Sequence, residues 1–216
     1  MAVSCTILRP LAQPRGRGEI ILTFDGGPPP SVSHELLDVL AKHEVKAMFC
    51  YIGNNMRAHP QIVKRALAEG HEIGGHTMTH SAAALIQREV LSREMEEFDS
   101  LVRSIDPSYE VRYFRPPLGV ISPAVFRAVN GREYRYAYVT FYVNDASTEL
   151  VGTSAVMDKI KVLTEINKGG AIVLHEMRYK HGDDPHQVDK QGLPAAVDDY
   201  IQWAKKKGYR FVSYSE

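Results

Sequence analysis

Short apolar runs alternate along the chain with longer segments in which apolar residues recur at helical spacing. Short runs of this kind, bounded by turn residues, predict buried β-strands, and the longer segments predict amphipathic helices. The predicted strands are Glu19–Phe24, Ala47–Ile52, Glu72–Gly74, Val111–Phe114, Tyr136–Val143, Ala171–Leu174 and Arg210–Val212. The predicted helices are Ser33–His43, Pro60–Glu69, Ala83–Ser104, Ser122–Val129, Ser154–Asn167 and Pro194–Lys207.

This alternation predicts parallel strands joined by crossover helices, and therefore an α/β architecture. The 216 residues suffice for one substantial domain or two small ones. Seven strands either close into a barrel or remain an open sheet, and periodicity does not decide between the two. In both architectures functional side chains lie on loops that follow the carboxyl ends of the strands.

Composition narrows the class of protein. Hydrophobic residues make up 44% of the chain and charged residues 24%, which excludes a wholly disordered polypeptide. Lys and Arg (26) balance Asp and Glu (26), so the chain lacks the basic excess of a protein whose main partner is nucleic acid. No apolar run approaches the roughly 18 residues that span a bilayer. Nine His against two Cys favour metal or acid–base chemistry over a disulfide scaffold.

Polar side chains follow five of the predicted strands at the point where each strand ends. They are Asp25, the pair His76 and His80, Arg115, Asn144 with Asp145, and His175. Because the carboxyl ends of parallel strands meet at one edge of a sheet, the sequence predicts that these side chains form one site.

His76 and His80 are a candidate metal-binding pair. Two His four residues apart ligate one ion either from a helical turn or from an irregular loop. The spacing alone favours two packing or surface histidines, because such pairs often arise by chance. Their position after a strand and two glycines, among the other polar strand ends, favours metal binding.

Asp25 and Arg115 are a candidate base and its cationic partner. Asp25 precedes Gly26-Gly27 and three prolines, so it is a turn cap, a general base or a metal ligand. Arg115 precedes two prolines that fix the turn. A guanidinium there either keeps a nearby carboxylate ionised or forms an ordinary structural ion pair.

His175 ends the most hydrophobic predicted strand and is a candidate general acid. A carboxylate partner would stabilise its protonated form, and Asp145 is the nearest candidate for that partner. The alternatives are a core histidine at 175 and a turn residue at 145.

Four of these segments occur in the order found in a known family. TFDGGP (23–28), GHEIGGHTMTH (70–80), RPPLG (115–119) and IVLHE (172–176) resemble signature segments of the polysaccharide deacetylases, the family-4 carbohydrate esterases with a NodB homology domain. The resemblance spans residues 20–212. It implies a single domain with a distorted (β/α) barrel, usually of seven parallel strands, here residues 19–216 after an N-terminal extension of residues 1–18.

The resemblance implies a metal-dependent hydrolase that removes acetyl groups from N-acetylglucosamine in chitin, peptidoglycan or similar polymers, or from O-acetylated xylan. It also implies a divalent metal, with Zn²⁺ favoured, and a polysaccharide or oligosaccharide partner. The implied roles are Asp25 as base, Arg115 as its orienting partner, His175 as acid with Asp145 beside it, His76 and His80 as metal ligands, Leu118 as a backbone donor to the oxyanion, Leu174 as a wall of the acetate pocket, and Tyr142 as an aromatic contact for the sugar.

The first segment departs from the family pattern TFDDGP, whose second Asp is the third metal ligand. Gly26 stands at that position. Another residue or water then completes the site, or the metal binds weakly, or the site binds sugar without hydrolysis. The polar loop after His175 offers His181, Asp183 and Asp184 as substitutes, although a solvated loop is the simpler interpretation.

The fourth segment departs as well, because the family shows DxxDW there. In one register Asn144 and Ser147 take the two Asp positions, and in the other Asp145 takes the first. The Trp is absent, and Phe141 or Tyr142 is the aromatic substitute.

The leading hypothesis is an N-acetyl polysaccharide deacetylase, and the second is a weak or inactive relative that binds glycan. A nucleotide- or sugar-phosphate-binding protein is disfavoured because the chain has no glycine-rich phosphate loop. The resemblance implies a periplasmic, cell-wall or secreted location, although the first ten residues show no signal-peptide pattern. Export would permit a disulfide between Cys5 and Cys50, and two buried free thiols are an equal alternative.

Overall fold

The structure is a computed structural model that describes residues 18–132, 134–145, 153–178 and 188–215. Within these ranges the main sheet has seven parallel strands in the order β5-β4-β3-β2-β1-β6, with β9 also paired to β1. The strands are β1 (Glu19–Gly26), β2 (Ala47–Tyr51), β3 (Glu72–Gly75), β4 (Tyr113–Phe114), β5 (Arg135–Tyr136), β6 (Gly169–His175) and β9 (Arg210–Phe211). Each predicted strand has a counterpart, and the predicted single α/β domain is confirmed.

A second, two-stranded antiparallel sheet follows His175. It consists of β7 (Met177–Arg178) and β8 (Val188–Asp189) and was not predicted. The residues between these strands lie outside the described ranges, and with them the proposed substitute ligands His181, Asp183 and Asp184. The predicted N-terminal extension, apart from Gly18, and Cys5 and Ser147 lie outside them too.

One chain segment joins the two edges of the curled sheet. β5 lies beside β4 at one edge, and Phe141, a few residues later, pairs with Ile172 of β6 at the other edge. The neighbouring N–H of Thr140 donates to the carbonyl of Ala171 at 2.8 Å. The predicted strand Tyr136–Val143 is therefore wrong in extent, because a segment that crosses between two edges pairs only at its ends. The result is the distorted half-barrel that the resemblance implied.

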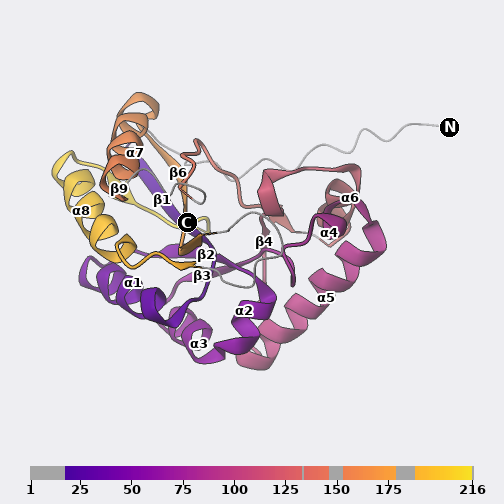
Figure 1. The fold of residues 1–216 in the computed structure, drawn as a ribbon. Helices are drawn as coiled ribbons and strands as arrows, with labels where there is room; N and C mark the ends of the chain where they lie inside the picture. The colour runs from indigo at the N-terminus through magenta and orange to yellow at the C-terminus, as the bar shows by residue number, and fades with distance from the viewer. Residues whose placement is uncertain (1–17, 133, 146–152, 179–187, 216) are drawn as a thin grey trace.

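Helices cover the outer face of this half-barrel (Figure 1). They are α1 (Pro30–Lys42), α2 (Gly53–Ala58), α3 (Pro60–Ala68), α4 (Ala82–Ile86), α5 (Arg88–Ile105), α6 (Pro123–Gly131), α7 (Thr153–Asn167) and α8 (Leu193–Lys206), with a 3₁₀ turn, η1, at Pro117–Gly119. The single helix predicted over Ala83–Ser104 is wrong, because Gln87 has extended backbone and separates α4 from α5. The short helix α2 was not predicted. None of the helices in the described ranges is long and apolar enough to cross a membrane.

Successive side chains of β1 contribute alternately to two apolar clusters, and this alternation decides which face Asp25 occupies. Leu22 and Phe24 pack in the large cluster between the sheet and the helices, whereas Ile21 packs in a smaller cluster on the inner face. Successive strand side chains point to opposite faces, so Thr23 and Asp25 share the inner face with Ile21. The same parity places His175 on the inner face, since Ala171 belongs to the inner cluster.

Parallel register then brings the strand ends together. Asp25 is the register partner of both Cys50 in β2 and His175 in β6. Arg115 follows β4 directly, and its N–H donates to the carbonyl of Gly75 at the end of β3. Cys50 is a buried free thiol whose pKa is raised by burial.

Candidate active site

Asp25 and Arg115 form a buried ion pair at the mouth of the half-barrel. Nη1 of Arg115 donates to Oδ1 of Asp25 at 2.5 Å and to Oγ1 of Thr23 at 2.8 Å, and Nε donates to the carbonyl of Ala137 at 3.1 Å. The two charged side chains are 5% and 6% exposed. Burial acts against the charge of the guanidinium, but the Asp25 carboxylate outweighs it and raises the pKa of Arg115. The structure thus brings together the two residues that the sequence placed on different strand ends.

His76 and His80 lie on an irregular loop after β3. Thr77 and His80 have positive φ angles of 65° and 57°, which residues other than glycine rarely adopt. The carboxylate of Glu94 in α5 accepts the N–H of Met78 at 2.9 Å and so holds the middle of the loop. The centres of the two imidazole rings are 5.0 Å apart.

Both imidazoles suit a divalent metal. Nδ1 of His76 donates to the carbonyl of Arg115 at 2.7 Å, which makes Nε2 the nitrogen with the lone pair. Burial lowers the pKa of His76 and lowers that of His80 to about 4. The two rings are therefore in the neutral, ligating form at neutral pH.

Gly26 stands where the resemblance implies a third ligand. Its φ of 95° lies in the left-handed region that favours glycine. Among the described residues no group of three His, Cys, Asp or Glu side chains is arranged to hold a metal ion. Within the described residues, His76 and His80 therefore supply two ligands for a metal ion, and no third protein ligand stands beside them.

His175, Asp145 and Lys190 form a second charged cluster, next to Asp25. Oδ1 of Asp145 lies 2.7 Å from Nδ1 of His175, and Oδ2 accepts the N–H of His175 at 2.8 Å and Nζ of Lys190 at 2.7 Å. Burial opposes the charge of Asp145, but His175 and Lys190 outweigh it and lower the pKa of Asp145. Of the two registers left open for the fourth segment, the one with Asp145 gives His175 its carboxylate partner.

Glu176 is fully buried beneath the turn that follows Asp25. Its Oε1 accepts the hydroxyl of Ser33 in α1 at 2.7 Å, and its N–H points to the carbonyl of Asp25 at 3.4 Å. A Cβ built on Gly27 would lie only 2.0 Å from Oε2, so the carboxyl fills the place of a side chain there. Burial raises the pKa of Glu176 to about 8, which makes it a neutral acid at neutral pH.

The three predicted substrate contacts differ in their surroundings. Leu118 lies in η1 with φ of 57°, and its side chain is 73% exposed. Leu174 is buried in β6 beside Phe24, in the large cluster between the sheet and the helices. Because strand side chains alternate, Leu174 points away from the face that carries His175, and its predicted place in the wall of the acetate pocket is wrong. The Tyr142 ring is 55% exposed and stands edge-on to the ring of His175, with centres 6.4 Å apart. Tyr142 is thus an exposed aromatic surface next to the cluster of His175 and Asp145.

Sequence reasoning missed three side chains that support the site. Glu94 belongs to the polar face of a long amphipathic helix and carries no local signal. Lys190 reaches Asp145 only because β8 pairs with β7. Glu176 had a usable signal, since a carboxyl group directly after an apolar strand is either exposed or specifically accommodated.

Comparisons with known proteins agree with this fold. The family model described as "Polysaccharide deacetylase" matches residues 12–137, more than half of the chain. The chain belongs to the polysaccharide deacetylase family.

Relatives with stated activities include enzymes that act on two polymers. The chain is 35% identical to a chitooligosaccharide deacetylase of Sinorhizobium fredii over 161 residues, which cover 74% of this chain and 73% of the relative. It is 31% identical to a peptidoglycan-N-acetylglucosamine deacetylase of Bacillus cereus over 207 residues, which cover 94% and 89%.

Solved structures share the fold. The peptidoglycan N-acetylglucosamine deacetylase Bc1960 superposes with a TM-score of 0.78 at 28% identity, covering 93% of this chain and 87% of the other. A family-4 pseudoenzyme of Bacillus anthracis superposes with a TM-score of 0.74, covering 90% of this chain and 63% of the other. At 18% identity it is similar in fold alone.

Proposed function

We propose that this protein hydrolyses the acetamido group of N-acetylglucosamine residues in a polysaccharide, releasing acetate and leaving a free amine. The observation that carries the proposal is the pairing of two buried charged clusters at neighbouring strand ends. Asp25 with Arg115 supplies a base, and His175 with Asp145 supplies an acid. The relatives that act on chitooligosaccharides and peptidoglycan support this choice of substrate.

Asp25 accepts a proton from a water molecule as the water oxygen adds to the acetyl carbon. Arg115 fixes one oxygen of the Asp25 carboxylate, so the base stays oriented for this step. The backbone N–H of Leu118 is the donor that we assign to the oxygen that becomes negative.

His175 then protonates the nitrogen of the sugar as the C–N bond breaks. Asp145 holds the Nδ1 side of the ring, which directs Nε2 towards the leaving group and stabilises the imidazolium. The exposed ring of Tyr142 beside His175 offers a stacking surface for a sugar.

His76 and His80 would hold a divalent metal, for which we propose Zn²⁺. When bound, such an ion supplies Lewis-acid polarisation of the acetyl carbonyl. With Gly26 at the third position, we expect weaker binding than three protein ligands would give.

A second candidate function is glycan binding with little or no hydrolysis. The specific observation in its favour is the absence of a three-ligand group from the described residues. We favour hydrolysis because Asp25 is buried against Arg115 and the partly buried His175 is held by Asp145, so both proposed proton-transfer residues have charged partners.

The test is acetate release from a chitooligosaccharide and from a peptidoglycan fragment, each with and without added Zn²⁺ and with a chelator. We expect release that the chelator suppresses and that Asp25→Asn abolishes without loss of the fold. Absence of acetate with every divalent metal tried, together with measurable glycan binding, would establish the second candidate. For location we propose the cell wall, the periplasm or the surrounding medium, because the polymers named for the relatives lie there.

A further inference from the structure

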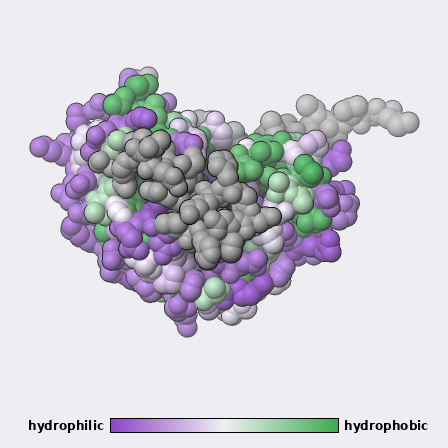
Figure 2. Space-filling model, in the orientation of Figure 1, coloured by the Kyte–Doolittle hydropathy of each residue, from purple (hydrophilic) through white to green (hydrophobic). Residues whose placement is uncertain are grey.

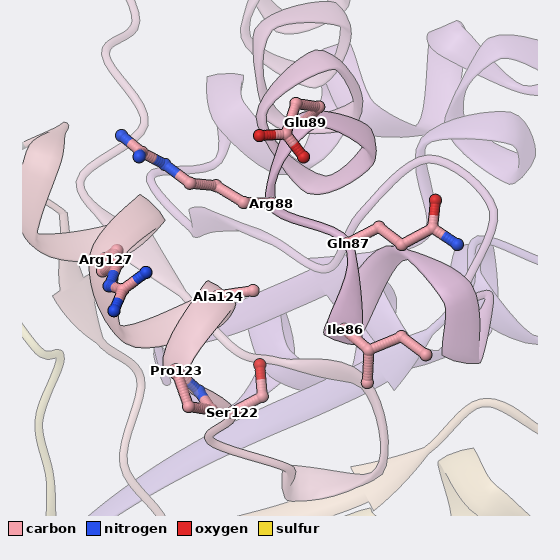
Figure 3. A pocket seen from close by; sticks show the side chains of 8 residues that line it. All are labelled: Ile86, Gln87, Arg88, Glu89, Ser122, Pro123, Ala124 and Arg127. Carbon is pink, nitrogen blue, oxygen red and sulfur yellow. The ribbon is translucent and has the colours of Figure 1, made fainter.

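A cavity of about 480 Å³ lies between the amino-terminal turns of α5 and α6 and the end of α4. Figure 3 shows the side chains that line it. They are Ile86, Gln87, Arg88, Glu89, Ser122, Pro123, Ala124 and Arg127. None of these residues belongs to the active site described above.

Arg88 and Arg127 line the cavity from two different helices, α5 and α6, and stand on the same side of it (Figure 3). Neither guanidinium makes a hydrogen bond or ion pair with another described residue. Other arginines of this surface do have acidic partners, as Arg57 has Glu97 and Arg132 has Glu96. Two guanidinium groups with open donors are thus gathered in one cavity.

The charge of the cavity matches a ligand with a single negative charge. Two arginines against one glutamate, Glu89, leave a net charge of +1. The planar fork of a guanidinium binds a carboxylate through two parallel hydrogen bonds. Beside the arginines, Ile86 is 72% exposed and offers apolar surface for the carbon atoms next to the carboxylate.

The cavity is connected to the active site by an exposed apolar loop. Leu118 of the active site precedes Ser122 of the cavity by four residues, a span of at most about 14 Å. Leu118, Val120 and Ile121 are all exposed along this loop. Hydrophobic surface gathers over α4 and α6 (Figure 2), where this loop and Ile86 belong. A polymer with one unit in the active site could therefore run along the loop into the cavity.

We propose that this cavity is a subsite for a carboxylate carried by the glycan strand whose acetyl group is removed at Asp25 and His175. The inference rests on the proposed function and sharpens it, because peptidoglycan strands carry carboxylates on lactyl groups or on attached peptides, whereas chitin strands carry none. The subsite makes the protein selective for an acidic glycan over a neutral one of equal length.

The experiment compares three substrates of equal sugar number: a neutral chitooligosaccharide, a peptide-free peptidoglycan fragment with its lactyl carboxylates, and a fragment whose only carboxylates are on peptides. The variant is Arg88→Gln with Arg127→Gln. Arg93→Gln, on the exposed side of the same helix α5, is the matched control. Initial rates of acetate release give KM and kcat, and calorimetry gives binding without turnover.

We expect the double variant to raise KM for a carboxylate-bearing substrate by about 3- to 10-fold, the effect of two partly exposed ion pairs. Its kcat stays the same, because the contact is made equally in ground and transition states. The chitooligosaccharide and the control variant show no change. Glu89→Gln lowers KM for the acidic substrate. Which of the two fragments responds identifies the source of the carboxylate.

Equal KM changes for neutral and acidic substrates, or no change for either fragment, would overturn the subsite and leave the deacetylase proposal standing. If no substrate releases acetate, calorimetry still decides. Tighter binding of an acidic fragment than of the chitooligosaccharide, lost in the double variant, supports the subsite. Equal binding overturns it.

Discussion

Replacing Glu176 by glutamine tests whether a neutral acid supports the turn that carries Asp25. The carboxyl is wholly buried, accepts the Ser33 hydroxyl with Oε1, and packs Oε2 against Gly27. Oε2 has no hydrogen-bond partner among the described residues. Glutamine has the same shape and never ionises, so it separates the charge of this side chain from its packing.

The size of the effect follows from the pKa of the buried acid. Burial raises the pKa of Glu176 from 4.5 to about 8. The folded protein therefore binds this proton more tightly than the unfolded chain. Its contribution to stability is complete below about pH 4.5 and is lost as the pH rises to about 8. At about 1.4 kcal/mol for each pH unit, the loss is at most roughly 5 kcal/mol of the free energy of unfolding.

The assay is urea unfolding of the wild type and of Glu176→Gln at several values between about pH 5 and about pH 8. We expect the wild type to lose stability across this window relative to the variant, and the difference to level off above about pH 8. Other ionisable groups cancel in the difference between the two proteins. Glu35→Gln, at an exposed position of α1, is the control and should follow the wild type.

Parallel curves for the wild type and Glu176→Gln would refute the reasoning, because they would mean that Glu176 is ionised and compensated in the folded protein. A difference that grows towards low pH would refute it as well, since this is the behaviour of a stabilised carboxylate.

Three other changes test the active site. Gly26→Asp places a carboxylate at the missing ligand position and should tighten Zn²⁺ binding as measured by calorimetry. The variant should also lower the free energy of unfolding by about 1–2 kcal/mol, because position 26 has a left-handed backbone conformation. Unchanged Zn²⁺ affinity would mean that the third ligand position is already filled. Lys190→Met removes a cation that lowers the pKa of Asp145. The Asp145 carboxylate stabilises the fold above about pH 4 and ceases to do so as the pH falls, and we expect this contribution to shrink by about 1–3 kcal/mol in the variant. Lys190→Arg should restore the stability in the same unfolding assay. Arg115→Lys keeps the positive charge but loses the planar guanidinium that contacts both Asp25 and Ala137. We expect kcat to fall by about 100-fold while the circular dichroism spectrum stays unchanged. A kcat within a factor of about two of wild type would mean that Arg115 does not orient the base.

The strand ends were predictable because two local rules act together. An apolar run followed by a polar residue marks the end of a strand, and parallel register then places Asp25 opposite His175 without further information. The ion pair of Asp25 with Arg115 follows from the same rules, because two opposite charges buried at one edge of the sheet are stable only when they are paired.

The remaining contacts depend on tertiary structure that no local pattern encodes. Gln87 has no unusual sequence context, yet its extended backbone divides a helix whose apolar periodicity is continuous. Tyr136–Val143 has the composition of a strand, but it pairs with the sheet only near its two ends, because the segment between them crosses from one edge of the sheet to the other. Lys190 meets Asp145 through a hairpin whose pairing is not visible in the spacing of the residues.

The crossing segment from β5 to Asp145 has a consequence for the separation between the proposed base, Asp25, and the proposed acid, His175. Its carbonyl at Ala137 holds Arg115, and thereby Asp25, while its far end supplies Asp145 to His175. Base and acid are thus both attached to one stretch of peptide, which acts as a spacer of fixed length between them. Inserting or deleting a single residue in that stretch would therefore move both groups at once.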